Sequence, residues 1–235
     1  MSRPLLWNPG FRIIRTIYPP VDLFEDIADP ADWELLVSAE AKLNPRIGDE
    51  VGNLALVPVA RRISGPTASI AMGAFTHVSV DRPSRFCDGT YGVWYCGDRL
   101  EVALAETAYH FQRFMRATGE PPGDTDYRVL TCAITAEAEE APDDCLVDDD
   151  CRPGQLFGRQ VRTRNLDGIL YRSVRYPPGL AAAIFWPSCL TLPITQNQQL
   201  RYRWDGSHMT HYLPHGATAW TIWPIPGAVG AAPGQ

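Results

Sequence analysis

The chain lacks the features by which several large protein classes are identified. No apolar run approaches the roughly 18–20 residues of a transmembrane helix, so we expect no membrane association. The 235 residues contain no G-x-G-x-x-G, P-loop, H-E-x-x-H or G-x-S-x-G motif. These absences disfavour a Rossmann dehydrogenase, a P-loop NTPase, a zinc protease and an α/β-hydrolase.

Signs of a metal site, of secretion and of nucleic-acid binding are missing as well. The six cysteines form no C-x-x-C pair, and the five histidines show no ligand spacing tied to carboxylates. Met1–Trp7 has no signal-peptide h-region, so we expect a cytoplasmic protein with free, buried thiols and no metal. No basic stripe is interleaved with aromatic residues, and direct nucleic-acid binding is therefore not expected.

The negative charge of the chain is concentrated in one segment. The formal charge is −6, and residues Glu137–Asp150 hold eight acids and no base. Outside this segment 27 − 8 = 19 acids stand against 21 Lys and Arg, which is a balance of +2. We interpret the acidic segment as a solvated loop, and the remainder can accept an anionic ligand.

The pattern of residues predicts one α+β domain over 1–223 and a flexible tail over 224–235. Strands are predicted at 11–18, 91–96, 127–134, 168–171, 182–186 and 200–204. Helices are predicted at 22–25, at 30–43 with an end at 44–46, at about 99–116, and at 153–166 with a loop. Residues 70–80 fit either a helix or a strand. Because regular βαβ alternation is missing, a doubly wound sheet is disfavoured.

The helix predicted after residue 98 carries the sharpest candidate. Asp98-Arg-Leu-Glu101 has the pattern of a capping box, with Asp98 as the N-cap. On the helix that follows, Leu104 and Phe111 share an apolar face and Glu106 falls at its edge. Partial burial of a charged carboxylate is unfavourable unless other groups compensate for it. Glu106 therefore has either a functional role or an ion pair with a nearby arginine.

Four further polar residues are candidates for the same site. Arg85 presents the fork of donors that matches a phosphate, and a surface salt bridge is the alternative. Arg12 lies between apolar residues of a strand and points either to a site or to a buried carboxylate. Tyr95 can stack on a ligand, fill the core, or leave that role to a neighbouring aromatic. Ser173 lacks a nucleophile motif, so a hydrogen-bonding role is expected.

In this order and spacing, these residues resemble the RES domain family. The resemblance covers residues 11 to about 206 and rests on Ser84-Arg85-Phe86, Val93-Trp94-Tyr95, Leu104-Ala105-Glu106 and Asp167–Arg175. The chain departs from the family at Pro83-Ser84, where two glycines are expected. Extra sequence around 30–75 is similar to a longer subgroup.

The resemblance implies an ADP-ribosyltransferase-like fold with a mixed β-sheet core and flanking helices. It implies a toxin of a toxin–antitoxin pair that cleaves the nicotinamide–ribose bond of NAD+, by hydrolysis or with inorganic phosphate as co-substrate. No other cofactor is implied, the partners are NAD+ and a cognate antitoxin, and a homodimer is an open option. The implied catalytic residues are Glu106, Arg85 and Tyr95. The implied NAD+-binding residues are Arg12, Arg85, Tyr95 and Ser173.

The chemistry of this reaction is compatible with a single carboxylate. Cleaving the bond develops positive charge on the ribose, which one carboxylate can stabilise. Nicotinamide leaves without a general acid. Two alternatives remain open on the same residues: an ADP-ribosyltransferase that modifies a macromolecule, and a non-catalytic nucleotide-binding or antitoxin-interacting module.

Overall fold

The computed structural model of the chain describes residues 2–17, 29–42, 47–147 and 150–229. Its centre is an eight-stranded mixed sheet in the order β1-β2-β5-β4-β3-β6-β7-β8. The strands are β1 (Ser2–Arg15), β2 (Trp94–Gly97), β3 (Gly123–Glu140), β4 (Gly168–Arg172), β5 (Leu180–Ile184), β6 (Thr195–Trp204), β7 (Met209–Pro214) and β8 (Thr221–Ile222). The helices are α1 (Trp33–Glu40), α2 (Ile47–Val51), α3 (Ala68–Thr76), α4 (Leu100–Thr118) and α5 (Arg152–Thr163). Short 3-10 turns are η1 (Leu54–Leu56), η2 (Val59–Arg61), η3 (Asp143–Leu146) and η4 (Pro187–Cys189).

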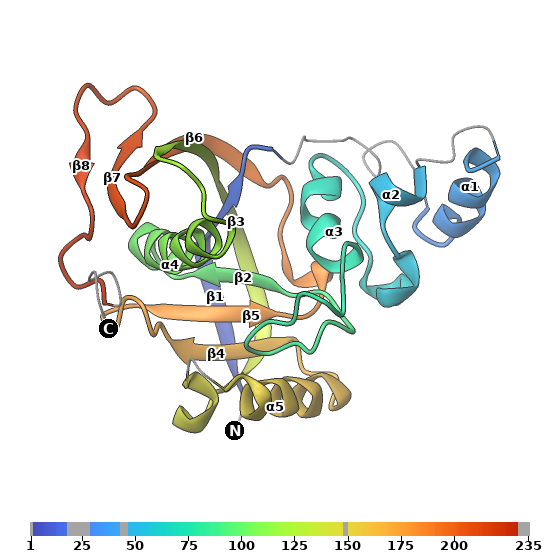
Figure 1. The fold of residues 1–235 in the computed structure, drawn as a ribbon. Coiled ribbons are helices and arrows are strands. Elements are labelled where there is room, and N and C mark those ends of the chain that lie inside the picture. Colours follow the sequence, from blue (N-terminus) through green and yellow to red (C-terminus); the bar gives the residue numbers. More distant parts are fainter. Residues whose placement is uncertain (1, 18–28, 43–46, 148–149, 230–235) are drawn as a thin grey trace.

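Five of the strands form a closed ring. β1 pairs with β3 along almost its whole length and meets β2 at one point, where Phe11 lies opposite Gly97. β2 pairs with β5, β5 with β4, and β4 runs parallel to β3. Strands β6, β7 and β8 extend outward from β3 (Figure 1). Because β1 and β2 share a single pairing, at the Gly97 end of β2, the two strands diverge from there toward Trp94.

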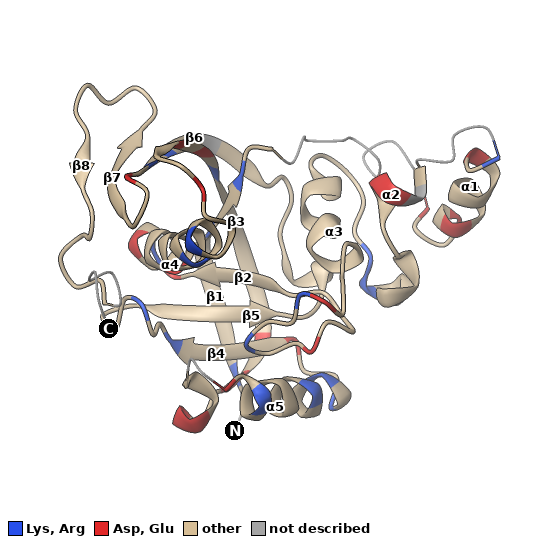
Figure 2. Cartoon of the chain, in the orientation of Figure 1, with Lys and Arg blue, Asp and Glu red and all other residues tan. Residues whose placement is uncertain are grey.

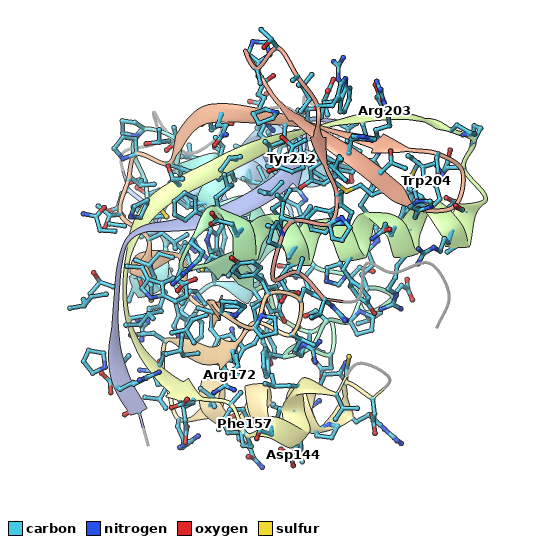
Figure 3. All side chains as sticks on the ribbon, turned by 90° about the vertical axis from the view of Figure 1, so that its left-hand side faces the viewer. Asp144, Phe157, Arg172, Arg203, Trp204 and Tyr212 are labelled. Carbon is cyan, nitrogen blue, oxygen red and sulfur yellow. The ribbon has the colours of Figure 1, made fainter. Side chains whose placement is uncertain are left out.

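Two apolar clusters stabilise this arrangement. The larger cluster includes buried side chains such as Trp94 and Leu130 of the ring and Phe75 of α3. The second packs α4 against β3, β6 and β7, where the Phe111 ring lies edge-on to Trp204 with centroids 5.9 Å apart. Figure 3 shows α4 lying along the strands that carry Trp204 and Tyr212. Helix α4 is therefore held firmly along its length.

The start of α4 differs from the predicted capping box. Arg99 occupies the N-cap position, and no side chain caps the helix. Asp98 is already engaged, because its Oδ1 accepts a hydrogen bond from the Leu180 backbone N–H (3.1 Å) and its carboxylate pairs with Arg99. The predicted apolar face is confirmed, since Leu104 and Phe111 are both buried.

The structure confirms the α+β class, with a mixed sheet and flanking helices. Of residues 70–80, for which the sequence allows a helix or a strand, 70–76 belong to helix α3 and 77–80 follow it as a loop. Strands β1 and β6 are longer than the strands predicted at 11–18 and 200–204. The acidic segment is not a loop throughout, because Glu137–Glu140 complete β3 between β1 and β4. There Glu139 forms an ion pair with Arg164 after α5, which offsets part of the local negative charge.

Some predictions fall on residues at or beyond the edges of the described chain. The helix at 22–25 and the helix end at 44–46 lie outside the described residues. Within 224–229, Ile225 and Ala228 pack on the second cluster, and the Val229 N–H donates to the Arg175 carbonyl (2.8 Å). All six cysteines are free and five are buried. In the described ranges, no helix is both long and apolar enough to cross a membrane.

Candidate active site

Glu106 and Ser173 meet where α4 passes the end of β4. The Ser173 hydroxyl donates a hydrogen bond to Glu106 Oε1 (2.8 Å) and accepts one from the Tyr176 backbone N–H (2.9 Å). Ser173 is buried, with 1% of its surface exposed. Because a serine hydroxyl has a single proton, this proton is committed to the carboxylate, and the Glu106 side chain is held in one orientation.

The surroundings of Glu106 affect its charge in two opposing ways. Burial is the largest influence and raises the pKa of Glu106 above the ordinary value of a glutamate. The hydrogen bond from Ser173 and the positive charges of Arg175 and Arg85 act in the other direction. The Arg175 guanidinium lies 3.3 Å from the centroid of the Tyr109 ring, a cation–π contact that fixes its position. The carboxylate therefore lies in a largely dry setting in which its charge acts strongly on a neighbour.

Arg85 comes from the loop that precedes β2. Its Nη1 lies 3.5 Å from the Cys145 carbonyl oxygen and 3.4 Å from that of Val147, both at η3. The same side chain lowers the pKa of Glu106, which places it within electrostatic range of the carboxylate. Helix α5 packs directly on this loop at Gly154, where a Cβ atom would lie 2.4 Å from the Arg85 carbonyl. Only glycine permits so close an approach.

Tyr95 holds this loop on both sides of Arg85. Its phenolic oxygen lies 2.8 Å from Ser84 Oγ and accepts a hydrogen bond from the Phe86 backbone N–H (3.0 Å). Burial raises the pKa of Tyr95 to about 12, so the phenol is neutral at physiological pH. Tyr171 of β4 packs edge-on against the Phe86 ring with centroids 5.0 Å apart. Tyr95 thus acts on Arg85 through the loop.

Arg12 lies at the point where β1 and β2 diverge. Its Nη1 donates to the Tyr95 carbonyl (3.1 Å), and its guanidinium carbon lies 4.7 Å from the centroid of the Trp94 ring. Burial lowers the pKa of Arg12. Within the described residues no carboxylate forms an ion pair with it, so the alternative of a buried carboxylate partner is not observed there.

The predicted site residues lie on both sides of β2. Consecutive side chains of a strand point to opposite faces, so Trp94 and Tyr95 face opposite ways and Arg12 lies on the Trp94 side. Gly97 shares the side of Tyr95, and a Cβ atom there would lie 2.7 Å from Val102, so α4 packs on that side. The structure therefore groups Arg85, Glu106 and Ser173 and places the guanidinium of Arg12 across the strand.

A cavity of about 1290 Å³ opens between the ring and α3. Arg12, Ser84, Tyr95 and Arg128 are among its lining residues, whereas Arg85, Glu106 and Ser173 are not. Its volume exceeds the roughly 300–1,000 Å³ of common small-molecule pockets, which leaves room for a dinucleotide. Two lining residues connect the two groups: Ser84 belongs to the loop of Arg85, and the phenol of Tyr95 contacts that loop at Ser84 and Phe86.

Three residues near the site did not emerge from the sequence. Tyr171 and Arg175 flank Ser173 at alternate positions, and that spacing could have indicated that all three share one side of the chain. Arg128 lines the cavity from the middle of β3, and its neighbours in sequence carry no signal of this. In the described part of the chain, no three His, Cys, Asp or Glu side chains are grouped closely enough to hold a metal ion.

Comparison with known proteins identifies the family. The family model of the RES domain matches residues 59–205, which is more than half of the 235 residues. The chain belongs to the RES domain family. The matched range includes Arg85, Tyr95, Glu106 and Ser173 and leaves out Arg12.

One relative and one solved structure extend the comparison of this RES chain. The relative is a protein of Sinorhizobium fredii (strain NBRC 101917 / NGR234) named uncharacterized protein y4oC, which is 26% identical over 216 residues and 89% of each chain. The solved structure is described as the M. tuberculosis MbcT–MbcA toxin–antitoxin complex. Its similarity has a TM-score of 0.39 and 15% identity over 52% of this chain and 72% of that chain.

The arrangement in this RES domain suits the stabilisation of a cation. A fixed carboxylate in a dry site lowers the energy of positive charge that develops beside it, because the site need not reorganise during the reaction. Arginines near the same position can bind oxyanions through paired N–H donors. The site can therefore hold a ligand that carries both a phosphate and a centre that becomes positive.

Proposed function

We propose that this RES domain cleaves the nicotinamide–ribose bond of NAD+. The observation that carries the proposal is the Glu106 carboxylate, which is held by the Ser173 hydroxyl beside the charges of Arg85 and Arg175. Membership of the RES domain family supports the same reaction through the resemblance described above. The substrate has both features that the site can hold, a pyrophosphate and a ribose that becomes positive.

In the proposed reaction the bond between ribose C1′ and the nicotinamide nitrogen breaks. Nicotinamide leaves with the electron pair as a neutral molecule, and positive charge develops on the ribose ring. The Glu106 carboxylate stabilises this charge. Water or inorganic phosphate then bonds to C1′, and an attacking water releases its second proton to solvent. Ser173 keeps the carboxylate in place throughout.

The phosphates of NAD+ would be bound by arginines. Arg85 would contact the part of the substrate nearest Glu106, and Arg12 would bind the more distant part in the cavity. Tyr95 lies between the two arginines. Its carbonyl oxygen accepts a hydrogen bond from Arg12, and its phenol contacts the loop that carries Arg85. The proposed substrate path therefore follows the opening between β1 and β2.

The proposed biological role is a toxin that depletes the NAD+ of the cytoplasm and is restrained by a cognate antitoxin. Expression of the wild-type chain alone would then lower cellular NAD+ and arrest growth. The Glu106→Gln variant would do neither, because Gln has the shape of Glu without the charge. A wild-type chain that leaves NAD+ levels and growth unchanged would contradict the toxin role.

The experiment that tests the reaction is product analysis with purified protein. NAD+ is incubated with and without inorganic phosphate, and nicotinamide release and the ADP-ribosyl product are followed by mass spectrometry. ADP-ribose as the product indicates hydrolysis, and a phosphorylated ADP-ribose that requires phosphate indicates phosphorolysis. The matched control is Glu101→Gln, which changes an exposed glutamate in the first turn of α4.

The outcomes separate the proposal from its alternatives. Nicotinamide release by the wild type and Glu101→Gln but not by Glu106→Gln supports the proposal. Transfer of labelled ADP-ribose to an added protein or nucleic acid would instead indicate a transferase. No release under either condition, together with no effect of NAD+ on the melting temperature, would overturn the proposal.

A further inference from the structure

Two arginines stand together on the floor of the cavity. In the register of β1 and β3, Arg12 lies opposite Leu130 and Ile14 lies opposite Arg128. All four residues line the cavity, because every second residue of a strand points to the same face. Arg12 and Arg128 are therefore diagonal neighbours, and the residues of such a pair are about 7–8 Å apart, with their Cβ atoms somewhat closer. Both long side chains can reach one anion between them.

Arg12 has no counter-charge among the residues that the structure describes. Its one hydrogen bond goes to the neutral carbonyl oxygen of Tyr95, and its guanidinium lies over the Trp94 ring. No carboxylate of the described chain forms an ion pair with it. A guanidinium that is withdrawn from water without a counter-charge raises the free energy of the folded state. An anionic ligand in the cavity would relieve this cost.

The Arg128 side chain is fixed beside Arg12 by a contact with β6. Its Nη1 donates to Gln196 Oε1 of β6 (2.9 Å), which fixes the side chain against the neighbouring strand. Burial lowers the pKa of both arginines, and each guanidinium remains charged because an arginine in a protein does not lose its proton.

The other walls of the cavity favour the same place for an anion. Arg82, in the loop before β2, adds a third positive charge to the lining. Asp49 and Glu50 line the wall formed by α2, which carries the acidic colour in Figure 2. Negative charge is therefore repelled from α2 and attracted to the floor formed by β1 and β3.

We propose that Arg128 and Arg12 together form the binding site for the pyrophosphate of a dinucleotide. Paired N–H donors of a guanidinium bind two phosphate oxygens at once, and two arginines suit two linked phosphates. Arg128 is thus a substrate-binding residue that contacts neither the scissile bond nor Glu106. The dinucleotide identity rests on the proposed function, whereas the two-arginine anion site does not.

The test is the binding of two probes, ADP-ribose and inorganic pyrophosphate, measured by calorimetry. Arg128→Gln removes the charge. The control is Arg116→Gln, because Arg116 is exposed on α4 and its Nε donates to the Ser207 carbonyl oxygen (2.9 Å), away from the cavity. Loss of a charge-assisted hydrogen bond predicts that Arg128→Gln weakens ADP-ribose about ten- to a hundred-fold. Arg116→Gln should bind both probes like the wild type.

Kinetics give a second readout. Because Arg128 binds a part of the substrate that does not react, Arg128→Gln should raise the KM for NAD+ with kcat nearly unchanged. A variant that lowers kcat and leaves KM and ADP-ribose affinity unchanged would overturn the proposal. Loss of probe binding in Arg128→Gln, with no nicotinamide release by the wild type, would uphold the anion site and reject the proposed reaction.

If the Arg128→Gln variant does not fold, the wild-type protein can be tested by chemical modification. Phenylglyoxal modifies accessible arginines, and mass spectrometry locates the modified residue. Saturating ADP-ribose should protect Arg128 and leave Arg116 reactive. Unchanged modification of Arg128 in the presence of bound ADP-ribose would overturn the proposal, as would a wild-type protein that binds neither probe.

Discussion

The hydroxyl of Ser173 donates a 2.8 Å hydrogen bond to the carboxylate of Glu106, joining the end of β4 to the middle of α4. The two residues are 67 positions apart in the chain. The bond keeps the carboxylate in one orientation and favours its charged form. The candidate active site depends on this contact, because burial alone would favour the protonated acid.

Replacing Ser173 by Ala should raise the pKa of Glu106 further. The hydrogen bond from Ser173 lowers that pKa, and its removal leaves burial less opposed. The charged carboxylate is the active form. In a plot of kcat against pH, the rise on the acid side should therefore move to higher pH. The same rise should stay in place in Ser207→Ala, which changes a surface turn. An unmoved rise in Ser173→Ala would separate Ser173 from the ionisation of Glu106.

The raised pKa of Glu106 also predicts how stability depends on pH. The folded state holds the proton of Glu106 above pH 4.5, the ordinary value, where the unfolded chain has released it. The stability that Glu106 contributes therefore falls as pH rises from 4.5 to its folded pKa. The Glu106→Gln variant does not have this loss. The difference in melting temperature, variant minus wild type, should therefore increase as the pH rises through that range and stay constant at higher pH. A constant or decreasing difference would contradict the raised pKa.

Replacing Tyr95 by Phe should loosen the loop that carries Arg85. The change removes the phenolic contacts with Ser84 and the Phe86 N–H, and leaving a buried donor unpaired lowers the free energy of unfolding by about 1–3 kcal/mol. Activity should fall without a shift of the pH profile, since the pKa of Tyr95 is about 12. Chemical denaturation and kinetics measure both effects, with Tyr212→Phe on β7 as the control. Wild-type stability in Tyr95→Phe would show that the loop does not need the phenol.

The contacts of Arg62 predict a local effect away from the candidate active site. Its buried guanidinium donates to the carbonyls of Val57, Pro30 and Leu54 and pairs with Glu34 of α1. Arg62→Met keeps most of the volume and leaves these acceptors unpaired, at a cost of about 2 kcal/mol or more.

Hydrogen exchange distinguishes local from global loosening in Arg62→Met. Amides of α1 and of residues 47–57 should exchange faster, while those of β3 should keep their protection. Arg116→Met is the control for the loss of a surface arginine. Faster exchange throughout β3 would show that the α1 segment is integral to the core.

The part of the candidate site that depends on helical periodicity could be predicted from the sequence. Leu104, Phe111 and Glu106 lie on one helix, so roughly 3.6 residues per turn place Glu106 at the edge of the buried face. The order of the family elements likewise indicated Arg85 and Ser173. That Glu106 and Ser173 touch follows from the packing of α4 against the end of β4, and no local pattern contains it.

The remainder depends on contacts between distant segments. Asp98 is of a residue type that often caps helices, yet its carboxylate accepts a hydrogen bond from the backbone N–H of Leu180, 82 residues away. The side of β2 on which Arg12 lies follows from the pairing of β1 with β3, and the same register brings Arg128 beside it. A single sequence does not encode register in any local motif, so neither placement could be predicted.

The most direct test of the account is the rate of nicotinamide release from saturating NAD+ by the wild type, Glu106→Gln and Glu101→Gln. Removing one preorganised charge from a dry site lowers kcat by about 10²–10³. The account predicts that loss in Glu106→Gln alone, with ADP-ribose binding retained. Equal rates for Glu106→Gln and the wild type would contradict it.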